Sequence, residues 1–127
     1  MTDFSANVQK PGLTGIAPTY NAVTAADKFT AIPNARYMLH YKNGATAQAT
    51  GGSPNKITDP TTPIPGSSSA SAGFADAVTQ ASPGMTATSE FVVWIDNSTR
   101  FRDATGFINM VHPGTLTTVT VAIFGPF

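Results

Sequence analysis

Two separate stretches of the chain alternate strictly between two kinds of side chain, and this pattern constrains the fold more than any other feature. Residues 36–42 place tyrosine or leucine at odd positions and polar or flexible side chains at even positions. Residues 118–123 alternate threonine or alanine with valine or isoleucine. Because successive side chains of a strand point to opposite faces, both stretches are predicted to be strands with one buried face.

Further strands are expected between turn signals along the rest of the chain. Residues 91–95 form a continuous apolar run, which predicts a strand buried on both faces. Residues 100–102 are expected to form a short strand or a corner, and residues 21–27 one helical turn. No amphipathic helix of useful length is predicted, so the pattern indicates an all-β protein, an antiparallel β-sandwich or barrel. The expected strands cover residues 27–32, 36–42, 73–79, 85–95, 105–111 and 115–124.

The dipeptide Asn43-Gly44 directly follows one of the alternating stretches. It is a signal for a type I′ turn, since both residues adopt positive φ at little cost. Residues 45–50 would then pair with residues 36–42. The sequence therefore predicts a hairpin at this point.

Two regions are poor in large apolar residues and rich in residues that break regular structure. Residues 1–26 contain Pro11-Gly12 and Ala17-Pro18, and are expected to form an extended arm. Residues 51–84 are rich in proline, glycine and serine, and are predicted to be a long excursion from the core. The expected organisation is the arm over residues 1–26 and one β-sandwich domain over residues 27–127.

The composition argues against several classes of partner and chemistry. Only 11% of the 127 residues are charged, whereas a soluble domain typically carries about 25%. Seven basic and seven acidic residues cancel, so neither nucleic acid nor a membrane is expected as a partner. Cysteine is absent, which removes disulfides and thiolate chemistry. No apolar run approaches the length of a membrane span, and the first residues lack the features of a secretion signal.

Catalytic and metal-binding patterns are weak. His40 lies within a predicted strand and His112 precedes a Pro-Gly turn, but the chain has no Gly-x-Ser-x-Gly motif. Asp96 and Asp103 lie near two arginines, which favours an ion-paired corner over a cation site. Glu90 is the only glutamate, and the sequence places no second carboxylate beside it. We therefore expect no enzyme, and no catalytic, metal-binding or cofactor-binding residues.

Aromatic residues on strands leave two interpretations open. Tyr37, Tyr41 and Trp94 could form a platform that stacks on sugars or bases, but strand aromatics more often pack across strands, so a core role is favoured. Asn97-Ser98-Thr99 matches a glycosylation sequon. Because no secretion signal accompanies it, we do not expect it to be used.

Two blocks of the sequence resemble the small head-decoration, or minor capsid, proteins of tailed bacteriophages. The first runs from Gly12-Leu13 through Pro18-Thr19-Tyr20 and Asp27-Lys28-Phe29 to the stretch Ala35–Gly44, with its Leu-His-x-Lys-Asn-Gly motif. The second is residues 100–111 together with the Thr/Val-rich end up to Val121. The blocks cover about half of the chain. Residues 51–84 are longer than the family's connection, and the Gly-Pro-Phe that often precedes the last strands stands here at residues 125–127.

This resemblance implies a β-sandwich that binds the outside of an assembled phage head, commonly as a trimer. The expected function is that of a cement protein on the capsid exterior of the virion, and the expected partners are the major capsid protein and further copies of the chain. The expected contact residues are apolar side chains of the arm and the excursion, although these residues could equally cap the sandwich itself. They are Phe4, Val8, Leu13, Ile16, Ile57, Ile64 and Phe74.

Three other functions remain open from the residues. An exposed sandwich could bind host glycans through Tyr37, Tyr41 or Trp94. The chain could also be a tail or head-fibre subunit of the virion. A hydrolase that uses His40 or His112 ranks last.

Overall fold

The computed structural model describes residues 2–44, 56–57, 78–79, 90–112 and 118–127. Within them the chain is almost entirely β-structure. Its only helical elements there are a short 3₁₀ turn, η1, and one turn of α-helix, α1. In chain order the elements are β1 (Thr2–Asp3), η1 (Ser5–Asn7), β2 (Val8–Gln9), β3 (Asn21–Ala22), β4 (Ala26–Thr30), β5 (Tyr37–Asn43), β6 (Lys56–Ile57), β7 (Val78–Thr79), β8 (Glu90–Ile95), α1 (Ser98–Phe101), β9 (Phe107–Val111) and β10 (Val119–Phe124).

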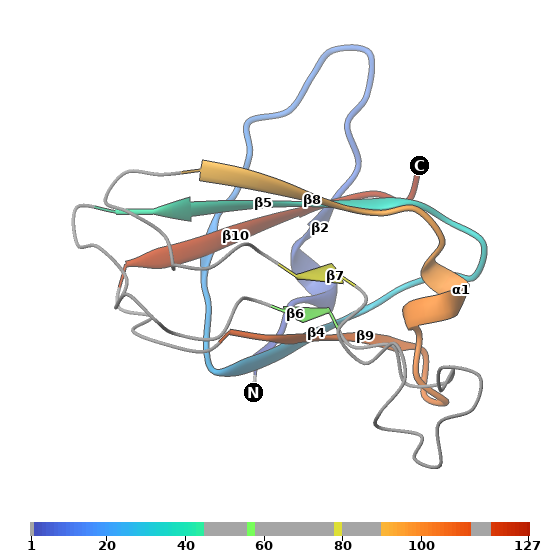
Figure 1. Cartoon of the computed structure of the whole chain (residues 1–127). Coiled ribbons are helices and arrows are strands. Elements are labelled where there is room, and N and C mark those ends of the chain that lie inside the picture. The colour runs from blue at the N-terminus through green and yellow to red at the C-terminus, as the bar shows by residue number, and fades with distance from the viewer. Residues whose placement is uncertain (1, 45–55, 58–77, 80–89, 113–117) are drawn as a thin grey trace.

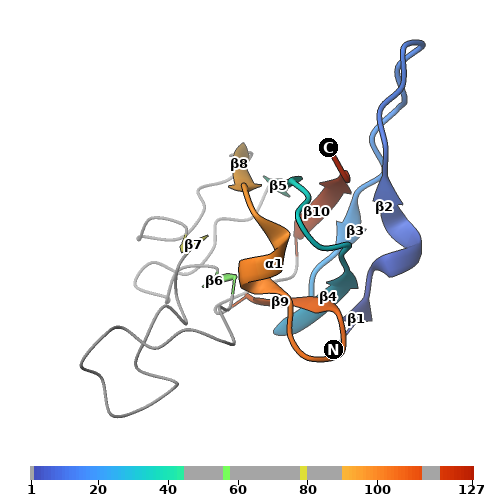
Figure 2. The ribbon, with the colours of Figure 1, turned by 90° about the vertical axis from the view of Figure 1, so that its right-hand side faces the viewer.

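The strands form two sheets that lie over one another (Figures 1 and 2). One sheet has the order β1-β4-β9-β6-β7, and the other has the order β2-β10-β5-β8, with β3 also paired to β10. The predicted all-β sandwich is confirmed. The sheets are mixed rather than purely antiparallel, because β1 pairs parallel to β4 and β2 pairs parallel to β10.

The core lies between the sheets and is built from the alternating positions. Tyr37, Leu39 and Tyr41 of β5 are buried, and so are Phe29 of β4 and Ile108 of β9. The rings of Phe29 and Tyr37 meet edge to face across the sandwich, with centroids 5.3 Å apart. The alternation predicted for residues 36–42 is thus confirmed, and the tyrosines have the favoured core role, whereas Trp94 is 44% exposed. In β10, Val119, Val121 and Ile123 belong to the core as predicted, but Ala122 on the opposite face is buried as well.

The hairpin predicted at Asn43-Gly44 is wrong. β5 pairs along its length with β10 on one edge and with β8 on the other. Both edges of β5 are therefore occupied by strands other than the predicted partner, and residues 45–50 themselves lie outside the described residues. Neither Asn43 nor Gly44 adopts positive φ, and Gly44 N instead donates to Thr118 O at 3.0 Å.

Two other predictions made from local sequence patterns are wrong, because contacts with distant parts of the chain determine the structure there. The helical turn expected over residues 21–27 is replaced by β3 and the start of β4, since Asn21 and Ala22 pair with β10. The burial expected on both faces of residues 91–95 is also wrong. Among the described strands β8 is the last of its sheet, and its outward side chains Val92 and Trp94 are 49% and 44% exposed.

The corner expected after β8 is the single-turn helix α1. Asn97 caps it, accepting a hydrogen bond from Thr99 N at 3.1 Å. This is the ordinary role of asparagine at a helix start. Arg102 then bridges to Ile108, so the chain turns directly into β9.

Residues 2–9 belong to the body of the sandwich. β1 pairs with β4 in one sheet and β2 pairs with β10 in the other, so the segment crosses from sheet to sheet. Between the two strands Phe4 enters the core and is only 3% exposed. The part of the expected arm that leaves the body is residues 10–20 (Figure 1). Most of the expected excursion lies outside the described residues, apart from β6 and β7, which pair with each other.

Candidate interaction surface

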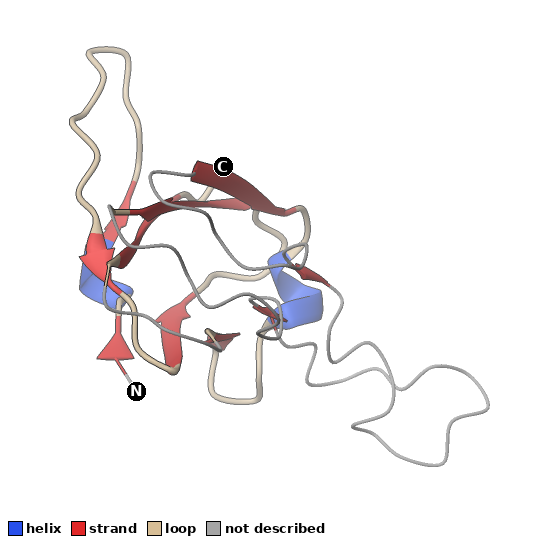
Figure 3. Ribbon diagram, turned by 60° about the vertical axis from the view of Figure 1, so that its left-hand side comes forward, coloured by secondary structure: helices blue, strands red, loops and turns tan. Residues whose placement is uncertain are grey.

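Residues 10–20 form a loop that projects from one sheet, called here the projecting loop. β5 fills one edge of β10, so β2 and β3 must share the other edge. β2 runs parallel to β10 as far as Gln9, and β3 returns antiparallel from Asn21. The chain between them has no place in the sheet and extends away from the sandwich (Figures 1 and 3).

The projecting loop is braced at its base and tightly turned at its tip. At the base, Gln9 Nε2 donates to Thr19 O at 3.0 Å, and Thr19 N donates to Gln9 Oε1 at 2.9 Å. At the tip, Gly15 N donates to Gly12 O at 3.0 Å, and Gly15 has a φ of 73°. Glycine reaches this conformation at no steric cost. The projecting loop thus consists of two segments joined by one turn.

The tip of the projecting loop is apolar and open to solvent. Leu13 is fully exposed and Ile16 is about half exposed. Lys10 is the only charged residue between positions 10 and 20. Single exposed apolar residues are common, but a leucine on a braced, projecting tip stabilises nothing in its own chain. Such a side chain is suited to insertion into another molecule.

A second exposed apolar group lies on the outer face of β8 and at the C-terminus. The Trp94 and Phe127 rings lie 5.8 Å apart between centroids. The Arg36 guanidinium lies 4.9 Å from the Trp94 ring centroid and also pairs with Asp96 at 3.1 Å. Trp94 is therefore engaged by neighbours within its own chain.

A polar cluster on the outer face of the β5 sheet joins the projecting loop to β5 and β8. Tyr20 Oη lies 2.7 Å from His40 Nδ1, and His40 Nε2 lies 3.1 Å from Glu90 Oε1. Lys42 Nζ lies 3.6 Å from the same carboxylate oxygen and 4.4 Å from the centroid of the Tyr20 ring. This cluster fixes the end of the projecting loop to the sheet. One signal for this cluster is present in the sequence, because His40 and Lys42 lie on the same face of an alternating strand.

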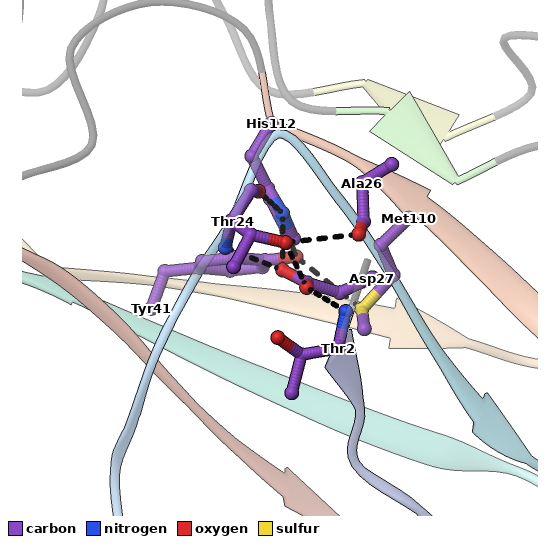
Figure 4. Close-up of polar contacts among 7 residues, drawn as sticks. All are labelled: Thr2, Thr24, Ala26, Asp27, Tyr41, Met110 and His112. Carbon is purple, nitrogen blue, oxygen red and sulfur yellow. Dashed lines mark hydrogen bonds and ion pairs between the residues drawn. The ribbon is translucent and has the colours of Figure 1, made fainter.

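A second histidine is buried between the sheets (Figure 4). His112 Nδ1 lies 3.0 Å from Thr24 O and 3.1 Å from Asp27 Oδ2, both of which are acceptors. Nδ1 therefore carries the proton, and Nε2 accepts from Tyr41 Oη at 2.9 Å. Neutral His112 satisfies every neighbour. Burial, which outweighs the hydrogen bond to Thr24 and the nearby charge, lowers the pKa of His112.

The carboxylate of Asp27 binds three elements of the structure. It accepts from Thr24 N at 2.7 Å, from the Thr24 hydroxyl and from Thr2 N at 3.0 Å, and it faces His112. Burial alone would raise its pKa, but these hydrogen bonds and His112 hold the pKa of Asp27 below its ordinary value. Burial and then the Asp27 charge raise the pKa of Tyr41. The cluster explains how a buried carboxylate is tolerated at this position.

The two histidines do not converge. Tyr41 faces the core and contacts His112, while His40 is the preceding residue of β5 and points to the opposite face. Each histidine lies beside its own carboxylate on its own side of the sheet. In the part of the chain that the structure describes, no group of three or more His, Asp or Glu side chains is placed to hold a metal. No helix there has the length and apolar character to span a bilayer.

The predicted contact residues separate into three sets. Phe4 is buried and Val8 packs against the core, so both cap the sandwich. Leu13 and Ile16 are exposed on the projecting loop. The side chain of Ile57, and Ile64 and Phe74 as a whole, lie outside the described residues.

Comparison with known proteins gives no family to which the chain can be assigned. No protein-family model, no curated protein and no solved structure matches it.

Proposed function

We propose that the protein is a structural virion subunit that decorates the outside of a tailed-phage head and cements neighbouring capsid subunits. The observation that carries the proposal is the braced projecting loop, which presents a fully exposed leucine at its tip. Such a loop is suited to a shallow pocket or seam on a partner. The resemblance of residues 12–29 and 35–44 to head-decoration proteins indicates the major capsid protein as the partner.

The surface of the chain fits repeated packing on a lattice. The formal net charge is zero, so copies can lie side by side without electrostatic repulsion. A ligand that binds only the assembled shell stabilises that shell by mass action. Several copies joined as a trimer would add to this effect, because each would bring its own loop to the surface.

Glycan binding through Trp94 is less well supported. Stacking on a sugar needs an open aromatic face, whereas the Trp94 ring already lies against Arg36 and near Phe127. If the protein binds heads through the projecting loop, Trp94→Ala should leave head binding within about twofold of wild type.

Leu13→Asp tests the proposal directly. Heads assembled without this protein are mixed with wild type or variant and sedimented, and bound protein is measured against concentration. We expect the variant to bind at least tenfold more weakly, because a buried carboxylate opposes insertion of the tip. Its thermal midpoint should not change, since Leu13 is fully exposed.

Ala6→Asp provides the matched control. Ala6 is exposed on η1, so this substitution adds the same charge at a site away from the projecting loop. This control should bind heads like wild type. Equal binding by wild type and Leu13→Asp would exclude the projecting loop as the contact. Absence of binding by the folded wild-type protein would exclude decoration itself.

A further inference from the structure

The N-terminal segment, residues 2–9, is held by pairing with β4 and β10, which are distant from it in the sequence. Phe4 N donates to Lys28 O at 2.8 Å and Thr2 N donates to the Asp27 carboxylate at 3.0 Å. At the other end of the segment, Gly125 N donates to Gln9 O at 2.8 Å. Together with the buried Phe4 side chain, these contacts fill a slot formed by β4 and β10.

Only the projecting loop connects this segment to the rest of the chain. Residues 10–19 are all exposed. Pro11 and Pro18 favour extended backbone on either side of the Gly12–Gly15 turn. If that one turn opens and the Gln9–Thr19 bonds are released, eleven residues can span up to about 35 Å, enough to reach an adjacent copy.

We propose that the N-terminal segment is exchangeable between copies, so that residues 2–9 of one chain occupy the slot of a second chain. The occupant is defined by the structure itself, because an identical segment already fits this slot. Exchange keeps every contact between residues 2–9 and the slot and gives up only the turn and the Gln9–Thr19 bonds of the projecting loop, so its balance depends on concentration and on that loop. The exchange is a property of the chain and stands whether or not the protein binds phage heads.

The projecting loop acts as the hinge of this exchange, and it can give the exchanged pair a contact that the closed chain lacks. Long loops usually favour the closed form, because they reverse without strain. Here, however, reversal leaves Leu13 fully exposed. In an exchanged pair the two hinges pass each other, and their leucines can be buried together. One Leu13 side chain cannot contact a second hinge and a capsid at once, so the exchanged pair is distinct from the loop-bound form.

The absence of cysteine allows a direct test. Asp3 and Lys28 are partners in the β1–β4 pairing. Chains carrying only Asp3→Cys are mixed with chains carrying only Lys28→Cys, unfolded together, refolded at high concentration and oxidised. A disulfide between positions 3 and 28, identified by peptide mass, then joins two different chains. The control mixture carries Ala26→Cys and Val111→Cys, which are partners within the β4–β9 pairing.

We expect the 3–28 disulfide to form at least fivefold more than the 26–111 disulfide. Adding Leu13→Ser to both chains should lower the 3–28 yield several-fold, whereas Thr14→Ser should not. Equal yields from the two mixtures, or a 3–28 yield that Leu13→Ser leaves unchanged, would overturn the proposal. The measurement uses no phage heads, so its failure is separate from failure of the decoration function.

Discussion

Gly125 occupies a position in which a side chain has no room. Its φ is 141°, and a Cβ atom there would lie 2.7 Å from Tyr37 Cδ1 and 2.9 Å from Arg36 O. Tyr37 is a core residue and cannot move aside freely. The glycine therefore lets the C-terminal residues lie close against β5, where Phe127 N donates to Arg36 O at 2.9 Å.

Gly125→Ala should lower the free energy of unfolding by about 2–4 kcal/mol, from the combined cost of backbone strain and overpacking. Chemical denaturation measures this loss. Gly12→Ala is the matched control, because nothing lies within 4 Å of a Cβ atom at Gly12. A Gly125→Ala protein as stable as the Gly12→Ala protein would show that the C-terminal residues are not packed as described.

The buried His112 and Asp27 make stability depend on pH in one direction. Both groups have a lowered pKa in the folded protein, so in each case the unfolded chain binds protons more readily. The contribution of such a group is present above its unfolded pKa and is lost as the pH falls. The stability is therefore expected to fall below about pH 6.5, where unfolded histidine begins to protonate, and further below about pH 4, where aspartate does.

Thermal melts between pH 7.5 and 5 test the contribution of His112. The wild type should lose stability across this range, while His112→Gln should start lower and show a smaller dependence on pH. His40→Gln, on the outer face of the sheet, is the control for a histidine outside the core. An identical pH dependence in wild type and His112→Gln would contradict the assignment of a neutral, buried His112.

Among the elements, the N-terminal segment differs most from its predicted role, since the sequence predicts an extended arm there and the structure has two paired strands. It contains one large buried side chain, Phe4, which joins the edges of both sheets. Phe4→Ala should destabilise the protein by about 3–5 kcal/mol, the usual cost of removing a buried phenylalanine. Leu13→Ala should change stability by less than about 0.5 kcal/mol. Urea denaturation of both variants checks the contrast, and equal values for the two would contradict the burial of Phe4.

Strands could be predicted from the sequence wherever one face is buried. The alternation in β5 and β10 marks the core face correctly, because the side-chain period of a strand is fixed by its backbone. The pairing of β5 could not be predicted, since Asn43-Gly44 is a strong local signal for a hairpin. Two distant strands, β8 and β10, occupy the edges of β5 instead. The apolar run in β8 could not reveal that the strand is the last of its sheet among the described strands.

The candidate surface was only partly predictable for the same reason. Phe4 and Leu13 are both large apolar residues in a region rich in small side chains, and the sequence ranks them alike. What separates them is pairing to distant strands. Residues 2–9 find partners in β4 and β10, whereas the chain that contains Leu13 is pushed out between β2 and β3. The Tyr20–His40–Glu90 cluster depends on the same long-range pairing, and its only local signal is the shared face of His40 and Lys42.

The whole molecule is a neutral sandwich, and the proposed contact depends on shape rather than on charge. The body is fixed by a core between two sheets, and the braced loop that would make the proposed contact extends away from it. Because the formal net charge is zero, binding to heads is expected to change by less than about threefold between 50 and 300 mM salt. A steep loss of binding with salt would indicate an interface dominated by ion pairs.

Cryo-electron microscopy of heads mixed with the purified protein tests whether the protein decorates the shell through the projecting loop. We expect density for a β-sandwich on the outer surface of the shell, with residues 10–20 directed at the major capsid protein and Leu13 at the contact. Heads without added density, or density in which residues 10–20 point away from the shell, would contradict it.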